Sequence, residues 1–192
     1  MSQIKHSRIE DIPASHKCEH EGYEYFRRKF VPFGTANHTH VCVYEIPPMK
    51  SAYPYHFHYK TEETFYIISG TGTLKTPEGE RTVTAGDLLF FPAGEAGAHK
   101  LTNVSDSENL VYIDFDATHE LDVAVYPDSD KIGIWVQRVA LLIPARSETN
   151  STDKFLLSLA SLICSPICVN IFCVCGNTVA PFLLIATPPL CL

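Results

Sequence analysis

The chain has 192 residues, of which 45% are hydrophobic and 19% are charged, a composition that supports a packed core and excludes general disorder. There are 15 Lys and Arg residues against 22 Asp and Glu residues, which gives a net charge of -7. With this charge and no basic stripe, the sequence argues against a nucleic-acid partner.

The amino-terminal segment, residues 1–22, is polar throughout. It lacks the apolar stretch of a secretory signal peptide. We therefore expect a cytoplasmic protein. In that compartment Cys18 and Cys42 are expected to be reduced thiols rather than a disulfide.

Short strands are predicted through the next segment, residues 23–146, which is expected to form an all-β domain. Runs rich in Val, Ile, Tyr, Phe and Thr alternate with Gly and Pro, and no apolar pattern of helical period persists. The expected strands are 25–31, 40–46, 63–68, 72–76, 81–84, 87–91, 98–103, 109–115 and 132–137. This spacing predicts an antiparallel sandwich or barrel. The last strand follows a turn at 126–130, and we expect it to pair with an amino-terminal strand.

The remaining segment, residues 147–192, is a hydrophobic and cysteine-rich tail. No charged residue follows Lys154, and five of the seven cysteines lie beyond it. Residues 155–175 are long enough to span a bilayer, but Pro166 and Asn170 interrupt them and no Lys or Arg follows. Three interpretations stay open: an appended sequence under no pressure to fold, which we favour, a membrane anchor, and an extension packed on the barrel or covered by a partner.

Histidine and glutamate side chains gather on the strands near residue 60. His56 and His58 stand two residues apart, so on a strand they project to the same face. Glu63 begins the next strand and can face the same pair after a short turn. Two imidazoles and a carboxylate are typical of a site for one divalent transition metal ion, and His99 is the best candidate for a fourth ligand. These ligands suit Mn, Fe, Ni, Zn or Cu without selecting among them.

A second pair of histidines has the same spacing. His38 and His40 precede Glu45 as His56 and His58 precede Glu63. No glycine follows at the matching distance, and prolines end the strand instead. We therefore interpret His38 and His40 as structural or solvent-facing residues.

Two segments resemble the two sequence motifs of the cupin superfamily. The first motif is matched by His56, His58, Glu63 and Gly70. The second motif is matched by Gly86, Pro92, Gly94, His99 and Asn103. The resemblance covers residues 40–116. It implies a double-stranded β-helix, the cupin jelly-roll barrel, with a metal ion inside its wider mouth, and it implies a homodimer.

The chain departs from these motifs in two places. Lys50 stands where the first glycine is expected. Residues 95–98 add two positions ahead of His99, and we expect these small residues to fold into a bulge that leaves His99 in place. Glu62 also satisfies the first motif, but the spacing to the motif glycine selects Glu63, and Glu62 would point to the opposite face of the strand.

The resemblance implies a small-molecule ligand or substrate at a metal with open coordination positions. We favour a metal-dependent enzyme acting on a small oxygenated organic compound, with dioxygenase, isomerase and lyase as the reaction types. The alternative is a non-catalytic cupin module that binds a small ligand, and a cupin without metal is disfavoured by the intact ligand set. No catalytic residue can be named from the sequence, and no organic cofactor is expected. The lumen beside Glu63 is expected to be mainly apolar, with Phe65 and Ile67 lining it.

Overall fold

The computed structural model describes residues 4–136, 139–144, 170–175 and 178–183. The chain divides into two units, Met1–Arg146 and Ser147–Leu192. The described residues contain strands and short 3₁₀ helices only, so the predicted all-β class is confirmed. In this described part of the chain, no helix has the length and apolar character needed to cross a membrane.

The first unit carries most of the described strands. They are β1 (Ala14–His20), β2 (Tyr23–Val31), β3 (Thr39–Ile46), β4 (Phe57–His58), β5 (Glu63–Ser69), β6 (Thr71–Thr76), β7 (Gly79–Thr84), β8 (Leu88–Phe91), β9 (Lys100–Asn103), β10 (Leu110–Ala117), β11 (Leu121–Tyr126), β12 (Lys131–Val136) and β13 (Val139–Pro144). The 3₁₀ helices are η1 (Ile9–Asp11), η2 (Glu95–Gly97) and η3 (Pro127–Ser129).

In the second unit, β14 (Asn170–Cys175) pairs antiparallel with β15 (Thr178–Leu183). The rest of the tail, and with it the choice among the three interpretations of that segment, lies outside the described residues.

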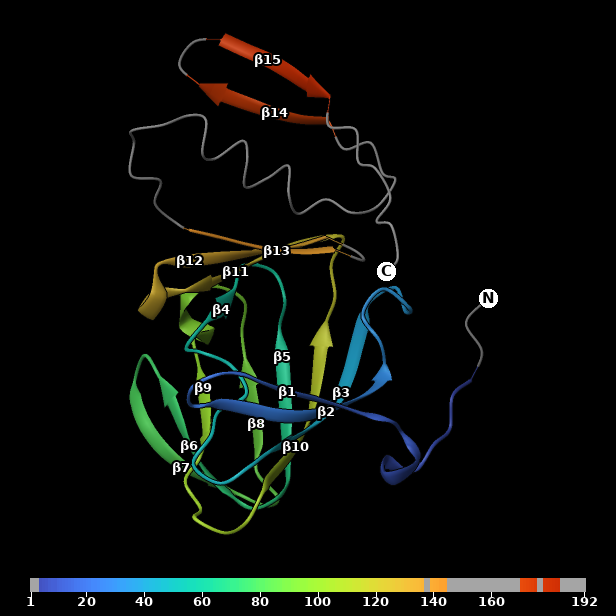
Figure 1. Cartoon of the computed structure of the whole chain (residues 1–192), viewed down its shortest axis with the longest axis vertical. Coiled ribbons are helices and arrows are strands. Elements are labelled where there is room, and N and C mark those ends of the chain that lie inside the picture. Colours follow the sequence, from blue (N-terminus) through green and yellow to red (C-terminus); the bar gives the residue numbers. More distant parts are fainter. Residues whose placement is uncertain (1–3, 137–138, 145–169, 176–177, 184–192) are drawn as a thin grey trace. The chain divides into compact units, whose positions relative to one another are not determined.

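The strands of the first unit form sheets whose order is not the order of the sequence. A six-stranded sheet runs β1-β2-β3-β10-β5-β8, a four-stranded sheet runs β13-β12-β11-β4, and a three-stranded sheet runs β7-β6-β9. Figure 1 shows β3, β10 and β5 side by side, with β11 and β12 near one end of them. Strands that are distant in sequence, such as β3 and β10, pair antiparallel along their whole length. The predicted antiparallel barrel is thus confirmed.

Alternation along the strands of the six-stranded sheet builds the core. Every second residue points inward, and the buried set includes Cys42, Tyr44, Ile46, Phe65, Ile67, Leu110 and Tyr112. Several of these residues also line a cavity in the barrel, namely Tyr44, Phe65 and Tyr112. The core therefore forms one wall of the cavity.

The predicted strands are all present, with shifted ends, and six further described strands were not predicted: β1, β4, β11, β13, β14 and β15. One predicted pairing is wrong. The strand expected at 132–137 is β12, and it pairs with β11 and β13 rather than with an amino-terminal strand. The cause is local, because the turn at η3 ends with Asp130 in the left-handed conformation (φ 50°) and folds β12 directly back on β11. The amino-terminal β1 pairs with β2 instead.

Candidate metal centre

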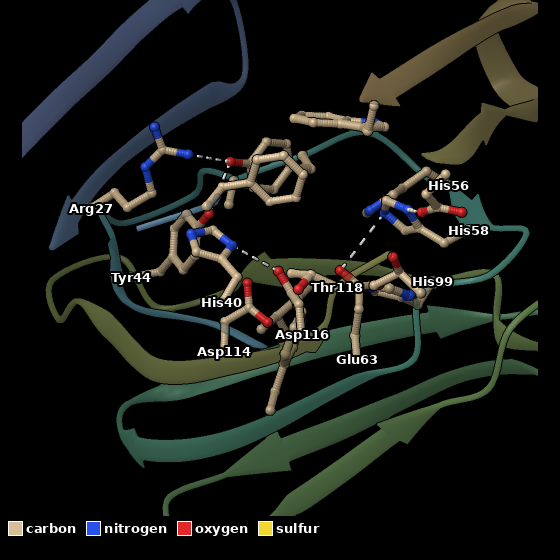
Figure 2. A pocket seen from close by; sticks show the side chains of 18 of the residues that line it. Arg27, His40, Tyr44, His56, His58, Glu63, His99, Asp114, Asp116 and Thr118 are labelled. Atoms are coloured by element: carbon tan, nitrogen blue, oxygen red, sulfur yellow. Dashed lines mark hydrogen bonds and ion pairs between the residues drawn. The ribbon is translucent and has the colours of Figure 1, made fainter. Parts of the chain in front are cut away.

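A cavity of about 370 Å³ lies inside the first unit, lined by side chains from strands of both larger sheets. Figure 2 shows the imidazoles of His56, His58 and His99 with Glu63 on one side of it. Arg27 lies on the opposite side, and the carboxylates of Asp114 and Asp116 lie between.

The backbone brings His56 and His99 face to face, although they are far apart in the sequence. The two residues form an antiparallel bridge. The N–H of His56 donates to the carbonyl of His99 at 3.1 Å, and the N–H of His99 donates to the carbonyl of His56 at 2.8 Å. The two ring centroids are 4.8 Å apart. The positions of these side chains are thus set by main-chain hydrogen bonds.

The added residues ahead of His99 form the 3₁₀ helix η2 rather than a bulge, and His99 stays at the cavity. Gly97 makes this turn feasible, because a Cβ at that position would lie 1.8 Å from the carbonyl oxygen of Pro92. The ring of Phe91 stacks on that of His99, with the centroids 3.6 Å apart. His99 is consequently held from both its backbone and its ring face.

Glu63 opens β5 in the six-stranded sheet, whereas His58 ends β4 in the four-stranded sheet. The side chain of Glu63 is buried, whereas that of Glu62 is exposed. Glu63 Oε1 lies 3.9 Å from Nε2 of His58. Glu63 Oε2 lies 3.5 Å from Nε2 of His99. One donor atom each of His56, His58 and Glu63 falls within 4.8 Å of the others, so the cluster joins the two sheets.

Each of the three imidazoles has its Nδ1 engaged by an oxygen acceptor. For His56 this acceptor is the carbonyl of Pro54 at 2.9 Å, and for His99 it is the carbonyl of Gly97 at 2.9 Å. For His58 it is Oδ2 of Asp122 at 2.6 Å. An N–H at Nδ1 leaves the lone pair on Nε2. Nε2 of His99 is buried without any hydrogen-bond partner.

Burial dominates the protonation of the cluster. It lowers the pKa of His56 to about 4 and that of His99 well below its usual value. Burial raises the pKa of Glu63 to about 8. The pKa of His58 is raised, because the hydrogen bond to Asp122 and the charge of Glu63 outweigh burial. Two neutral imidazoles and a buried carboxyl group are the groups that a metal ion stabilises.

The geometry fits one divalent transition metal ion. Donor atoms that share an ion at about 2.0–2.2 Å lie about 3–4 Å from one another, and the two donor separations to Glu63 fall in that range. The orphaned Nε2 of His99 would gain the partner that it lacks. Imidazole with carboxylate is also a ligand set of such ions.

Two carboxylates beside the cluster were not predicted. Asp114 and Asp116 stand two apart on β10, and the alternation Asp-Phe-Asp was the signal that could have found them. Donor atoms of Glu63, Asp114 and Asp116 also lie within 4.8 Å of one another. Each of the two aspartates has a buried Oδ1 without a hydrogen-bond partner. Burial raises the pKa of Asp114 well above its usual value.

These groups also correct the expectation about the lumen. Phe65 lines the cavity, but Ile67 lies in the core and not among the lining residues. His40, interpreted as structural or solvent-facing, is half-buried and lines the cavity, and its Nδ1 lies 3.0 Å from Asp116. Burial would lower the pKa of His40, but its hydrogen bond to Asp116 outweighs it and the pKa is about 9. His38 is exposed.

Asp122 is the other unpredicted residue at the site. It lies on β11, and besides the bond from His58 it accepts a hydrogen bond from the N–H of Lys60 at 2.9 Å. Burial would raise its pKa, but these bonds lower it to about 2. Asp122 therefore stays charged, and it fixes the ring of His58.

The family model described as a cupin domain matches residues 42–116. No curated protein matches the chain. A solved structure from Acidithiobacillus ferrooxidans, assigned as a sugar phosphate isomerase, is 26% identical with a TM-score of 0.63, and the alignment covers 74% of this chain and 92% of that one.

Two further solved structures share the fold at lower identity. A sugar phosphate isomerase of the cupin superfamily from Silicibacter pomeroyi is 17% identical with a TM-score of 0.66, covering 78% of this chain and 98% of that one. The polyketide cyclase RemF from Streptomyces resistomycificus is 22% identical with a TM-score of 0.52, covering 61% and 81%. The double-stranded β-helix is thereby confirmed. The resemblance to cupins expected from the two sequence motifs is thus confirmed for the barrel, by the cupin-domain match over residues 42–116 and by the shared fold of these neighbours.

Proposed function

We propose that this protein is a metal-dependent isomerase acting on a small hydroxy-carbonyl compound. His56, His58, Glu63 and His99 would hold one divalent transition metal ion, which supplies Lewis-acid chemistry to bound oxygen atoms. The observation that carries this proposal is the shared orientation of the three imidazoles, whose Nδ1 atoms are all engaged and whose Nε2 atoms are left for a ligand role. Among the three reaction types expected from the sequence, the neighbour assigned as a sugar phosphate isomerase supports isomerisation.

Isomerisation of a hydroxy-carbonyl compound needs a group that moves a proton. One C–H proton leaves the carbon that bears the hydroxyl group and is returned to the adjacent carbonyl carbon, while the hydroxyl proton passes to the former carbonyl oxygen, so atoms and electrons balance without an oxidant. Asp116 is placed for this task, because it lines the cavity beside Glu63 and its Oδ1 has no partner. The hydrogen bond from His40 to Oδ2 orients the carboxylate. Burial raises the pKa of Asp114, which favours the protonated carboxyl group that could donate a hydrogen bond to a substrate oxygen.

The test separates metal binding from proton transfer. The full chain is loaded with Mn²⁺, Fe²⁺, Ni²⁺ or Zn²⁺ in turn and incubated in D₂O with aldoses, ketoses and their phosphates, and exchange of the C–H proton beside the carbonyl is followed by NMR. We expect His58→Ala to lose metal and exchange. His38→Ala is the matched control and should keep both, because His38 is exposed. Asp116→Asn should keep the metal and lose exchange by at least about 100-fold.

Two outcomes would contradict the proposal. Retention of metal in His58→Ala would refute the site. Metal-dependent ligand binding without exchange in the wild-type protein would favour the alternative, a cupin module that binds a small ligand. The homodimer stays a prediction, which sedimentation of the full chain measures directly.

A further inference from the structure

Strand β2 contributes two basic residues to the lining of the cavity, the half-buried Arg27 and the exposed Lys29. Its residues alternate between two faces. On one face Arg27 and Lys29 line the cavity. On the other face Phe26 stacks on His16 and Arg28 donates to the carbonyl of Ile12 at 3.1 Å. Figure 2 shows Arg27 of β2 across the cavity from the candidate metal centre.

The guanidinium of Arg27 has no anionic partner in the described part of the chain. No carboxylate there lies within 4.0 Å of it, and its buried Nε has no hydrogen-bond partner. Its Nη1 donates to the hydroxyl of Tyr53 at 3.4 Å, and that hydroxyl lies 3.0 Å from the hydroxyl of Tyr44. Burial raises the pKa of both tyrosines well above the usual value, so they remain neutral.

A half-buried cation that meets only neutral hydroxyls is costly to desolvate unless an anion joins it. Asp116, elsewhere in the cavity, pairs with His40 instead of Arg27, and Oδ2 of Asp116 lies 3.0 Å from Nδ1 of His40. Lys29, two residues along β2, also has no carboxylate within 4.0 Å among the described residues, and it adds a second positive charge at this end of the cavity.

We propose that Arg27 and Lys29 bind the phosphate group of a phosphate-monoester substrate whose hydroxy-carbonyl end lies at the metal centre. The planar fork of a guanidinium matches two oxygens of a phosphate, and the two cations match the charge of the dianion. The neutral hydroxyl of Tyr53 fixes one edge of the guanidinium and leaves the buried Nε free to donate. This inference rests on the proposed function for the identity of the substrate's other end.

The experiment measures phosphate binding without the metal, so that it does not depend on the metal centre. The full chain is treated with a chelator and titrated with inorganic phosphate, and binding is followed by ³¹P line broadening. We expect Arg27→Met to weaken phosphate binding roughly 10- to 100-fold, the loss of one charge-assisted pair of hydrogen bonds. Arg28→Met is the matched control, because it removes the same charge from the opposite face of the same strand, and it should leave the affinity unchanged.

Arg27→Lys guards against a folding defect in Arg27→Met, because it keeps the charge and loses the fork. An intermediate affinity supports the inference. Equal phosphate affinity in the wild type and in both Arg27 variants would overturn it, as would malonate that competes with phosphate as strongly as phosphate itself.

With the metal restored, a hexose phosphate should bind more weakly to Arg27→Met, while the unphosphorylated hexose should bind equally to both proteins. Loss of proton exchange together with intact, Arg27-dependent phosphate binding would refute the isomerase and leave the phosphate site standing. Proton exchange that depends neither on the phosphate group of the substrate nor on Arg27 would refute the phosphate site and leave the isomerase standing.

Discussion

Replacing Asp122 by alanine removes the acceptor that orients His58, and it should weaken metal binding without unfolding the barrel. The carboxylate accepts from Nδ1 of His58 at 2.6 Å and from the N–H of Lys60 at 2.9 Å. Loss of such an outer partner lowers metal affinity by about 10- to 100-fold, which corresponds to about 1.4–2.8 kcal/mol. Because the pKa of Asp122 is about 2, the carboxylate is charged throughout the neutral range and can accept the hydrogen bond from His58 there.

The assay is competition for Zn²⁺ or Mn²⁺ between the protein and a chromogenic chelator, with circular dichroism as the check on the fold. Asp128→Ala is the matched control, because Asp128 is exposed and pairs with Lys75 at 3.2 Å rather than with a residue of the cluster. Asp122→Asn should fall between the alanine variant and the wild type, since an amide oxygen still accepts a hydrogen bond but carries no charge. Wild-type affinity in Asp122→Ala would refute the reasoning, because His58 would then need no orientation from β11 to serve as a ligand.

Three further predictions follow from the same geometry. Gly97→Ala should displace η2, lower the melting temperature and weaken metal binding, because its Cβ would meet Pro92 at 1.8 Å. At Gly94 a Cβ would meet open space, but the backbone has φ +89° and ψ −177°, a conformation that essentially only glycine adopts. Gly94→Ala should therefore cost about 1–3 kcal/mol of stability and keep the metal. His40 has a pKa of about 9 against 6.5 when unperturbed, so the stability that it contributes is present below pH 6.5 and lost as the pH rises toward 9. Denaturant titrations of the chelated protein should show this decline, and His40→Asn should reduce it. When the free metal concentration is about 100 times the Kd, bound metal should add about 2.7 kcal/mol to the free energy of unfolding. Chelation should remove this stabilisation, which is measured as a lower melting temperature. The melting temperature of His58→Ala should not change on chelation.

Much of the barrel was predictable, because apolar and polar residues alternate along the sequence of a long strand. In β5 buried residues alternate with half-buried or exposed ones, and the ranges of β3 and β5 were predicted within a residue or two. β4 has two residues, too few to show any period, and its existence depends on pairing with β11. In β11 itself, Val123 and Val125 alternate with smaller or polar residues, which is a strand signal that the predicted ranges omit.

Only those site residues that are linked by a short spacing in the sequence could be predicted. The separation of His56 and His58 and the choice of Glu63 over Glu62 follow from the two-residue period of a strand, and in the structure these side chains approach one another. Asp122 lies 64 residues from His58, and no local pattern links two such positions. Its role depends on which strands pair, and that is a property of the closed barrel.

The pairing of β4 with β11 has a consequence for the order in which the site is assembled. All four candidate ligands lie within the family match, which ends at residue 116, whereas β11 begins at Leu121. A growing chain that has just exposed His99 therefore carries every donor atom but lacks the strand that aligns His58 and the carboxylate that holds its ring. Contacts between distant parts of a chain form late, since a long loop must close first. We therefore expect the metal to bind in this geometry only late in folding. A fragment that ends at residue 116 would retain the four ligands without their alignment.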